Sequence, residues 1–246
     1  MVLHGRNILK MTLCVKGALS ALLGSNPLPG YPFAIAVIKP KNTMKNSFLT
    51  LLLSLLTLSL SAQEVSDFPD DPKEICPIKL GSRISESATV QTLSGKEIAL
   101  AEKIAEKPTL LIAYRGGWCP FCNQHLAEIQ KMLPEIKKMG YQVIAISADA
   151  PENLKPTISK HDLGYTIYSG SNLSAFDALG IGFELVGPTL SKYQKNDIDL
   201  VASQNVLPVP TVMVFDKKGE LRFSHVDPNY KERISGDLLM AVLENQ

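Results

Sequence analysis

The pattern of hydrophobic and polar positions changes its period several times between residues 79 and 246. Continuous apolar runs at 108–114 and 141–147 predict two buried strands. A third run at 211–215 leads into a polar turn and predicts a hairpin whose second strand covers 221–224. Short strands that alternate with helical stretches are typical of an α/β fold.

A long helix is predicted between the first two strands. Its apolar residues recur every three or four positions and therefore share one face: Cys122, Leu126, Ile129, Leu133 and Ile136. Pro120 suits the first helical position, because the N–H that proline lacks is not needed there, and Cys119 then becomes the N-cap. Lys137 and Lys138 suit the last turn, and Gly140 suits the cap after it.

Three shorter helices are expected near 152–161, 173–179 and 230–243. The stretch from 180 to 207 shows no clear period, so we expect it to be irregular. These elements together form one domain at 79–246, which is a normal size for a single globular unit.

The N-terminal part of the chain has a different pattern. Met44 is followed by Lys-Asn-Ser, an apolar run at 48–60 and then small residues. These are the parts of a secretory signal peptide, whereas a membrane span needs about 18 or more apolar residues. We therefore predict a signal peptide at 44–62, a linker at 63–78 and an exported domain, periplasmic or secreted. Residues 1–43 are expected to be either an extension upstream of the true start or a disordered leader, with a folded N-terminal segment as the alternative.

Charge excludes some classes of function. The chain has 246 residues, with 25 Lys and Arg against 24 Asp and Glu and a net charge of +1. A protein that binds nucleic acid or an anionic membrane surface through bulk charge needs a strong positive field, so neither partner is expected. The first 62 residues contain basic residues and no acidic one, so the domain itself is acidic. We also expect no stable membrane span in the exported form.

The candidate chemistry lies in two of the four cysteines, Cys119 and Cys122, at the predicted junction of strand and helix. A cysteine at a helix N-terminus faces unpaired N–H groups and the positive end of the helix dipole, which favour thiolate over thiol. Arg115 can add a positive charge. Cys122 lies three residues further along the helix, within the span that a disulfide tolerates. The spacing thus predicts that Cys119 attacks a substrate and that Cys122 resolves the intermediate.

Alternatives to this redox pair stay open. A Cys-x-x-Cys pair can form half of a zinc site. Among the histidines, only His125 has a spacing that could add a ligand to such a site, and we predict no metal. A purely structural disulfide is a second alternative in an exported protein. Cys76 could serve as a resolving cysteine in place of Cys122.

The sequence Arg-Gly-Gly-Trp-Cys-Pro-Phe-Cys at 115–122 resembles the active-site signature of the peroxiredoxin-like branch of the alkyl hydroperoxide reductase/thiol-specific antioxidant family, within the thioredoxin-like superfamily. Residues 207–219 and 223–230 are similar to the closing strands of that branch. The resemblance implies a thioredoxin-like fold, with a central mixed sheet flanked by helices. It also implies a cis peptide bond between Val209 and Pro210 that faces the cysteine pair.

Two positions depart from typical peroxiredoxins. Gly116 stands where they have Thr or Ser, and Pro210 stands where they have an Arg. Trp118 before the first cysteine, the Cys-x-x-Cys pair itself and the proline before Thr211 instead resemble disulfide exchangers. The resemblance therefore implies an oxidoreductase with disulfide exchange ahead of peroxide reduction, and a non-catalytic domain with a structural disulfide as the last alternative. We expect no bound cofactor, a protein disulfide or a peroxide as substrate, and a thioredoxin-type thiol as electron donor.

Overall fold

The computed structural model describes residues 68–246. The predicted extension at 1–43, the signal peptide at 44–62 and the first residues of the linker lie outside the described residues. The described part of the linker contacts the domain: the N–H of Glu184 donates to the carbonyl of Pro69, and the N–H of Ile78 donates to that of Leu179. No helix within 68–246 is long and apolar enough to cross a membrane.

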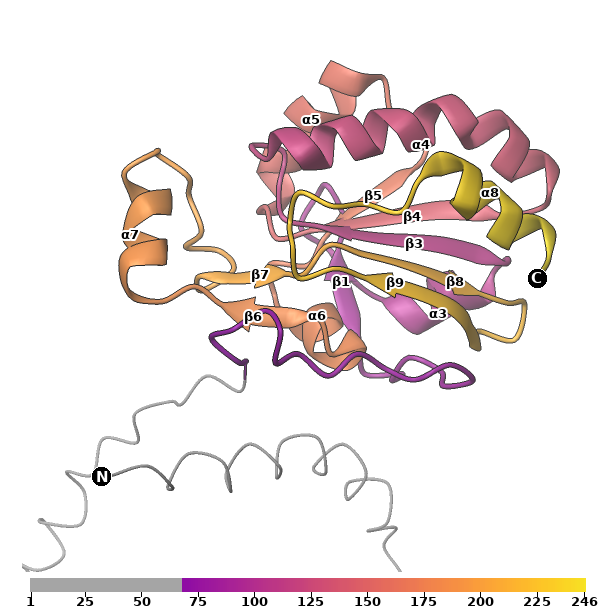
Figure 1. Cartoon of the computed structure of the whole chain (residues 1–246), viewed down its shortest axis with the longest axis horizontal. Coiled ribbons are helices and arrows are strands. Elements are labelled where there is room, and N and C mark those ends of the chain that lie inside the picture. The colour runs from indigo at the N-terminus through magenta and orange to yellow at the C-terminus, as the bar shows by residue number, and fades with distance from the viewer. Residues whose placement is uncertain (1–67) are drawn as a thin grey trace, which may run out of the picture. The chain divides into compact units, whose positions relative to one another are not determined.

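A seven-stranded mixed sheet forms the centre of the domain, with the strand order β2-β1-β5-β4-β3-β8-β9 (Figure 1). The central strand β3 pairs in parallel with β4 and antiparallel with β8, and β4 pairs in parallel with β5. Because β3 is covered on both faces, all of its residues are buried. The strands are β1 (Thr89–Gln91), β2 (Glu97–Ala99), β3 (Thr109–Tyr114), β4 (Gln142–Ser147), β5 (Thr166–Ser169), β8 (Thr211–Phe215) and β9 (Leu221–Val226).

Helices cover both faces of the sheet (Figure 1). Alternate residues of β3 point to opposite faces, so Leu110 and Ile112 pack with one helix layer and Leu111 and Ala113 with the other. The first layer holds α4 (Pro120–Lys138), α5 (Leu154–His161) and α8 (Gly236–Glu244), and a short 3-10 turn, η1 (Pro151–Asn153), precedes α5. The second layer holds α3 (Leu100–Ala105) and α6 (Ser174–Leu179). This arrangement confirms the predicted thioredoxin-like class.

The stretch predicted to be irregular contains regular structure. Strands β6 (Gly182–Glu184) and β7 (Val206–Pro208) form a separate antiparallel pair. Helix α7 (Gly187–Gln194) lies between them in sequence and stands apart from the main sheet in Figure 1. None of the residues of α7 is fully buried, so it has no continuous apolar face for a periodicity argument to detect.

The last helix begins later than expected. The segment 227–235, which we call the strap, connects β9 to α8 and contains no helix. Its last residue, Ser235, caps α8 by accepting a hydrogen bond from the N–H of Leu238. Within the strap, the carboxylate of Asp227 accepts from the N–H of Asn229, whose side chain accepts from the N–H of Lys231. Such local side-chain to backbone bonds compete with a helix, which explains the later start.

The predicted cis peptide bond is wrong, because residues 68–246 contain none. The bond between Val209 and Pro210 is trans, the form that X-Pro bonds prefer unless a tight turn requires cis. Here the chain passes from β7 to β8 without such a turn. The N–H of Val209 donates to the carbonyl of Ile181, and the carbonyl of Pro210 accepts from the N–H of Asp227, so neighbouring segments hold both sides of this bond.

Candidate redox-active cysteine site

Cys119 is the N-cap of α4, directly after the turn that leaves β3, and Pro120 is the first helical residue, as the sequence predicts. The cap residue is extended, with φ −87° and ψ 114°, and its carbonyl accepts from the N–H of Asn123. Its sulfur makes no regular capping hydrogen bond. Cys122 lies one turn further along, on the helix face that packs against the sheet.

Two glycines make the turn before Cys119 possible. A Cβ atom on Gly116 would lie 2.2 Å from the indole nitrogen of Trp118, and one on Gly117 would lie 1.9 Å from the hydroxyl of Thr157. Both distances are far below van der Waals contact, so this turn has no space for a larger side chain. The Gly-Gly pair therefore lets Trp118 and helix α5 approach the cysteine motif closely.

A buried carboxylate holds this turn. The N–H of Gly117 donates to Oδ2 of Asp149 at 2.7 Å, and the hydroxyl of Ser147 donates to the same oxygen at 2.9 Å. Burial raises the pKa of Asp149, and the N–H of Gly117 and the side chains of Ser147 and Trp118 oppose that rise. Asn123 completes the attachment by donating to the carbonyl of Gly117 at 2.8 Å. The end of β4 thus fixes the start of α4.

Cys119 and Cys122 are free cysteines and each residue is only 1% exposed, so a substrate reaches Cys119 only after neighbouring side chains move. The pKa of Cys119 is lowered from 9.0 to about 6. The largest cause of this lowered pKa is a hydrogen bond from the Cys122 side chain, and burial opposes it. The N–H of Cys122 and the charges of Arg115 and Arg233 lower the pKa further. Cys119 is therefore the thiolate of the pair near neutral pH.

Cys122 has the opposite character. Burial raises its pKa well above the usual value, and the nearby Cys119 raises it further. The charge of Arg233 lowers it, and Nη2 of that arginine donates a hydrogen bond to the Cys122 sulfur at 3.4 Å. The resting pair thus consists of a thiolate at Cys119 and a protonated thiol at Cys122.

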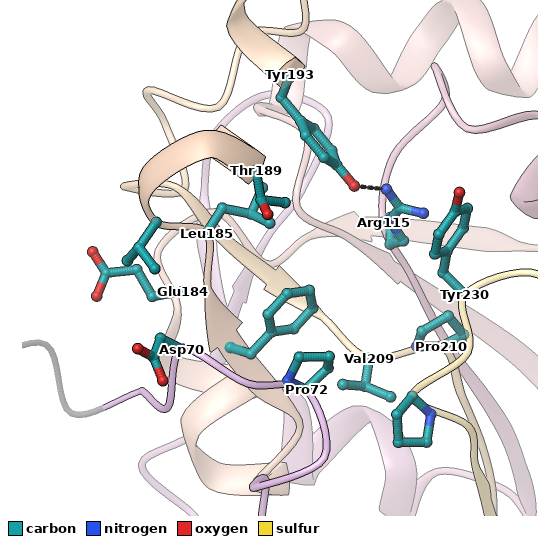
Figure 2. Close-up of a pocket in the computed structure, with 13 residues that line it drawn as sticks. Asp70, Pro72, Arg115, Glu184, Leu185, Thr189, Tyr193, Val209, Pro210 and Tyr230 are labelled. Atoms are coloured by element: carbon teal, nitrogen blue, oxygen red, sulfur yellow. Dashed lines mark hydrogen bonds between the residues drawn. The ribbon is translucent and has the colours of Figure 1, made fainter. Parts of the chain in front are cut away.

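Arg115 lies among aromatic rings. Its guanidinium carbon is 5.0 Å from the ring centre of Trp118, 5.4 Å from that of Tyr193 and 4.2 Å from that of Tyr230. Arg115 also donates a hydrogen bond to the hydroxyl of Tyr193, drawn as a dashed line in Figure 2. Burial lowers its pKa, and the two cysteines oppose that change, Cys119 more strongly than Cys122. Cation–π contacts of this kind compensate in part for the lost hydration of a buried cation.

A cavity of about 290 Å³ opens beside Arg115 (Figure 2). Its polar boundary includes Arg115 and the carboxylates of Asp70 and Glu184, and its other walls are mainly apolar or aromatic. Pro210 lines this cavity together with Arg115. The apolar and aromatic walls include Pro72, Phe183, Leu185, Val209, Pro210, Tyr193 and Tyr230.

Several site residues were missed by sequence reasoning. Asp149 closely follows a predicted buried strand, so a polar residue at the end of that strand was an available signal. Tyr193 lies on α7, in the stretch expected to be irregular. Arg233 lies 111 positions after Cys122, and no spacing rule links the two.

The other sequence candidates occupy defined places. His125 is buried on α4, and burial together with Arg233 and His225 lowers its pKa to about 4, so it is neutral near pH 7. Within 68–246, no group of three or more His, Cys, Asp or Glu side chains could hold a metal ion. Cys76 precedes β1, where its carbonyl oxygen lies against Gly180 after α6.

A mixed sheet with helices on both faces, and a Cys-x-x-Cys pair at the start of a helix, are features of the thioredoxin-like fold. Residues 83–224, more than half of the chain, match the model of the AhpC/TSA family. The chain therefore belongs to the AhpC/TSA family, as the motif at 115–122 indicated.

Known proteins of two kinds are similar to this chain. The thiol-disulfide oxidoreductase ResA of Halalkalibacterium halodurans is 28% identical over 93 residues, which are 37% of this chain and 52% of that protein. The chain thus matches about half the length of that relative. The chloroplastic peroxiredoxin Q of Gentiana triflora is 24% identical over 166 residues, which are 64% of this chain and 76% of that protein.

Solved structures support the same fold. Reduced Prx3 from Vibrio vulnificus in complex with hydrogen peroxide superposes with a TM-score of 0.56 at 18% identity, and the match covers 68% of this chain and 99% of that one. A peroxiredoxin-like protein from Aquifex aeolicus has a TM-score of 0.53 at 16% identity, covering 69% of this chain and 88% of that one. The family match and the two kinds of relative support a thiol-based redox function.

Proposed function

We propose that this protein is a thiol-disulfide oxidoreductase in which Cys119 attacks and Cys122 resolves. The observation that carries the proposal is the contrast within the pair, with the pKa of Cys119 at about 6 and that of Cys122 well above the usual value. At pH 7 a thiol with a pKa of about 6 is roughly nine-tenths thiolate, whereas one with a pKa of 9 is only about 1% thiolate. Cys119 is therefore mostly thiolate and can attack near pH 7, while Cys122 stays protonated until the resolving step.

The proposed reaction transfers two electrons. The Cys119 thiolate attacks one sulfur of a substrate disulfide, which forms a mixed disulfide and releases the other substrate sulfur as a thiolate. Cys122 then loses its proton and attacks the Cys119 sulfur, releasing the second substrate thiolate. The products are a Cys119–Cys122 disulfide and two substrate thiolates, which become thiols by taking up protons from solution. The spacing of three residues in a helix favours this closure without movement of the backbone.

Peroxide reduction is the second candidate. The similarity to peroxiredoxins supports it, as does Nε of Arg115, a buried donor without a hydrogen-bond partner that could bind a peroxide oxygen. The Cys119 thiolate would attack one peroxide oxygen, giving a sulfenic acid and, after protonation, water or an alcohol. Cys122 would then condense with the sulfenic acid and release water. Gly116 and Pro210 argue against this candidate, because typical peroxiredoxins hold the peroxide with a hydroxyl and an arginine at these positions.

One experiment discriminates between the two reactions. Trp118 is the single tryptophan and adjoins Cys119, so its fluorescence should follow the redox state. Reduced protein is mixed separately with hydrogen peroxide and with a protein disulfide, and the two second-order rate constants are compared. We expect the protein disulfide to react faster; a faster reaction with peroxide would assign the second function. A Cys119→Ser variant should respond to neither, and Cys122→Ser should accumulate the mixed disulfide.

The redox cycle also needs an electron donor. We propose that a thioredoxin-type thiol reduces the Cys119–Cys122 disulfide and that the protein itself carries no bound cofactor. Addition of thioredoxin, its reductase and NADPH should then support repeated turnover of the purified protein. A pair that no such donor reduces would instead favour the non-catalytic alternative, a permanently oxidised structural disulfide.

We further propose that the protein works after export, on the basis of the signal-peptide pattern at 44–62. N-terminal sequencing of the native protein tests this proposal. A first residue near Ala62 or Gln63 supports export, and an intact Met1 contradicts it.

A further inference from the structure

We propose that Arg233 is a further catalytic residue of the cysteine pair, which stabilises the Cys122 thiolate while Cys122 attacks the mixed disulfide on Cys119. The inference rests on the proposed function and assigns one residue to its second step. Nη2 of Arg233 donates to the Cys122 sulfur at 3.4 Å. Hydrogen bonds to sulfur are longer than those to oxygen, so at this distance Arg233 contacts a reacting atom directly.

The second step needs such a group because of where Cys122 lies. The residue is 1% exposed and packs in the apolar layer between α4 and the sheet, where burial disfavours a thiolate. At this exposure, water can stabilise only a small part of the charge that Cys122 must carry when it attacks. A guanidinium is permanently charged, so it can stabilise that charge without a proton transfer of its own.

Contacts within the strap hold Arg233 in place. Its Nη1 atom donates to the carbonyl of Tyr230 at 2.8 Å and also to that of Glu232. One nitrogen is thus anchored to the backbone while the other points at sulfur. The ring of Tyr230 packs edge-to-face on Phe121, 5.9 Å between centres, in the first turn of α4. The strap therefore positions the guanidinium before the reaction begins, which reduces the entropy lost in the transition state.

The two arginines act on different sulfurs. Cys119 raises the pKa of Arg115 more than Cys122 does, so the charge of Arg115 interacts more strongly with Cys119. Arg233 makes its hydrogen bond to Cys122 and affects Cys119 only through charge. Arg233 also lowers the pKa values of Arg115 and His125 through its charge, and the lowered pKa of His125 keeps that side chain neutral near pH 7. We therefore assign Arg115 mainly to the first step and Arg233 to the second.

In the assigned step, Cys122 gives up its proton to solvent and its sulfur attacks the Cys119 sulfur. The bond between Cys119 and the substrate breaks, the bond between Cys119 and Cys122 forms, and the substrate leaves as a thiolate. Arg233 exchanges no atoms. Its charge lowers the energy of the Cys122 thiolate before bond formation.

A neutral model disulfide separates the two steps. 4,4′-Dithiodipyridine releases one coloured thiopyridone when Cys119 attacks and a second when Cys122 resolves, so stopped-flow absorbance resolves two phases of a single turnover. We expect Arg233→Met to slow the second phase by about 10- to 100-fold near pH 7, as the loss of one charge-assisted hydrogen bond implies. The first phase should slow by less than about threefold, because Arg233 is the weakest of the causes that lower the Cys119 pKa.

Two further variants make the result specific. Arg233→Lys keeps the charge and should recover part of the second-phase rate, whereas Lys231→Met removes an exposed charge from the same strap and should leave both phases unchanged. The pH midpoint of the second phase should also rise in Arg233→Met, which a purely structural role would not cause. Circular dichroism checks that each variant is folded.

The possible outcomes are distinct. An unchanged second phase in folded Arg233→Met, or equal slowing of both phases, overturns the role of Arg233. A wild-type protein that shows no mixed-disulfide phase at all overturns the proposed function itself. Selective slowing with partial rescue by Lys supports the assignment.

Discussion

The hydrogen bond between the two cysteines should control the reactivity of Cys119, and Cys122→Ala tests this. The Cys122 side chain is the largest single cause of the low pKa of Cys119. Alanine removes the thiol and keeps the helix, because alanine is the best helix former. The N–H of Cys122 and the charges of Arg115 and Arg233 stay in place.

The expected magnitude follows from the contact that is lost. A hydrogen bond to a charged group contributes about 1.5–3 kcal/mol, and about 1.4 kcal/mol corresponds to one pKa unit. The pKa of Cys119, about 6 in the wild type, should therefore rise to about 7–8 in Cys122→Ala. The thiolate then forms mainly above neutral pH.

The rate of alkylation by iodoacetamide between about pH 4 and 10 measures this pKa, because only the thiolate reacts. Mass spectrometry of the peptide that contains Cys119 isolates its modification from that of other cysteines. Cys122→Ser is the matched control, since its hydroxyl can still donate a hydrogen bond and should produce a smaller rise. A midpoint that stays near 6 in Cys122→Ala would show that the helix N-terminus and the arginines lower the pKa without the second thiol.

Three further predictions concern the surroundings of the pair. Gly117→Ala should destabilise the protein by about 1–3 kcal/mol in urea unfolding, since its Cβ would lie 1.9 Å from the Thr157 hydroxyl. Adding Thr157→Ala should recover part of the lost stability. If stability does not recover, the strain lies elsewhere. Asp149→Ala should cost about 1–3 kcal/mol in the same assay, because it leaves the partly buried N–H of Gly117 without its acceptor. Unchanged stability would show that another group replaces the carboxylate. The stability of the reduced protein should rise between about pH 6 and 9, since in this range the unfolded chain keeps a proton on Cys119 that the folded protein has released. In urea titrations Cys119→Ser should lack this rise. Identical pH profiles of the variant and the wild type would contradict the lowered pKa.

Much of the fold could be predicted because its signals are local. The runs at 108–114 and 141–147 became β3 and β4, and the hairpin at 211–224 became β8 and β9. Helix α4 begins at Pro120 and ends before Gly140, whose φ of +90° suits glycine. Periodicity and caps depend on residues a few positions apart, so one sequence suffices to read them.

The incorrect predictions have physical causes of a different kind. Helix α7 has no fully buried residue, and its place depends on partly buried side chains that pack against distant parts of the chain. The start of α8 depends on hydrogen bonds within the strap that compete with a helix. The peptide bond before Pro210 is trans in a connection whose two sides hydrogen-bond to Ile181 and Asp227, partners that local sequence does not reveal.

The sequence by itself determined that two cysteines lie one helical turn apart at the N-terminus of a helix, because capping and spacing are properties of a short segment. Only the tertiary structure decided how the two sulfurs differ. Burial holds the proton on Cys122, and Arg233 reaches it from 111 positions away. Asp149 fixes the turn from 32 positions away, and Tyr193 contacts Arg115 from 78. These contacts depend on how the strands pair and the helices pack, which no local pattern specifies.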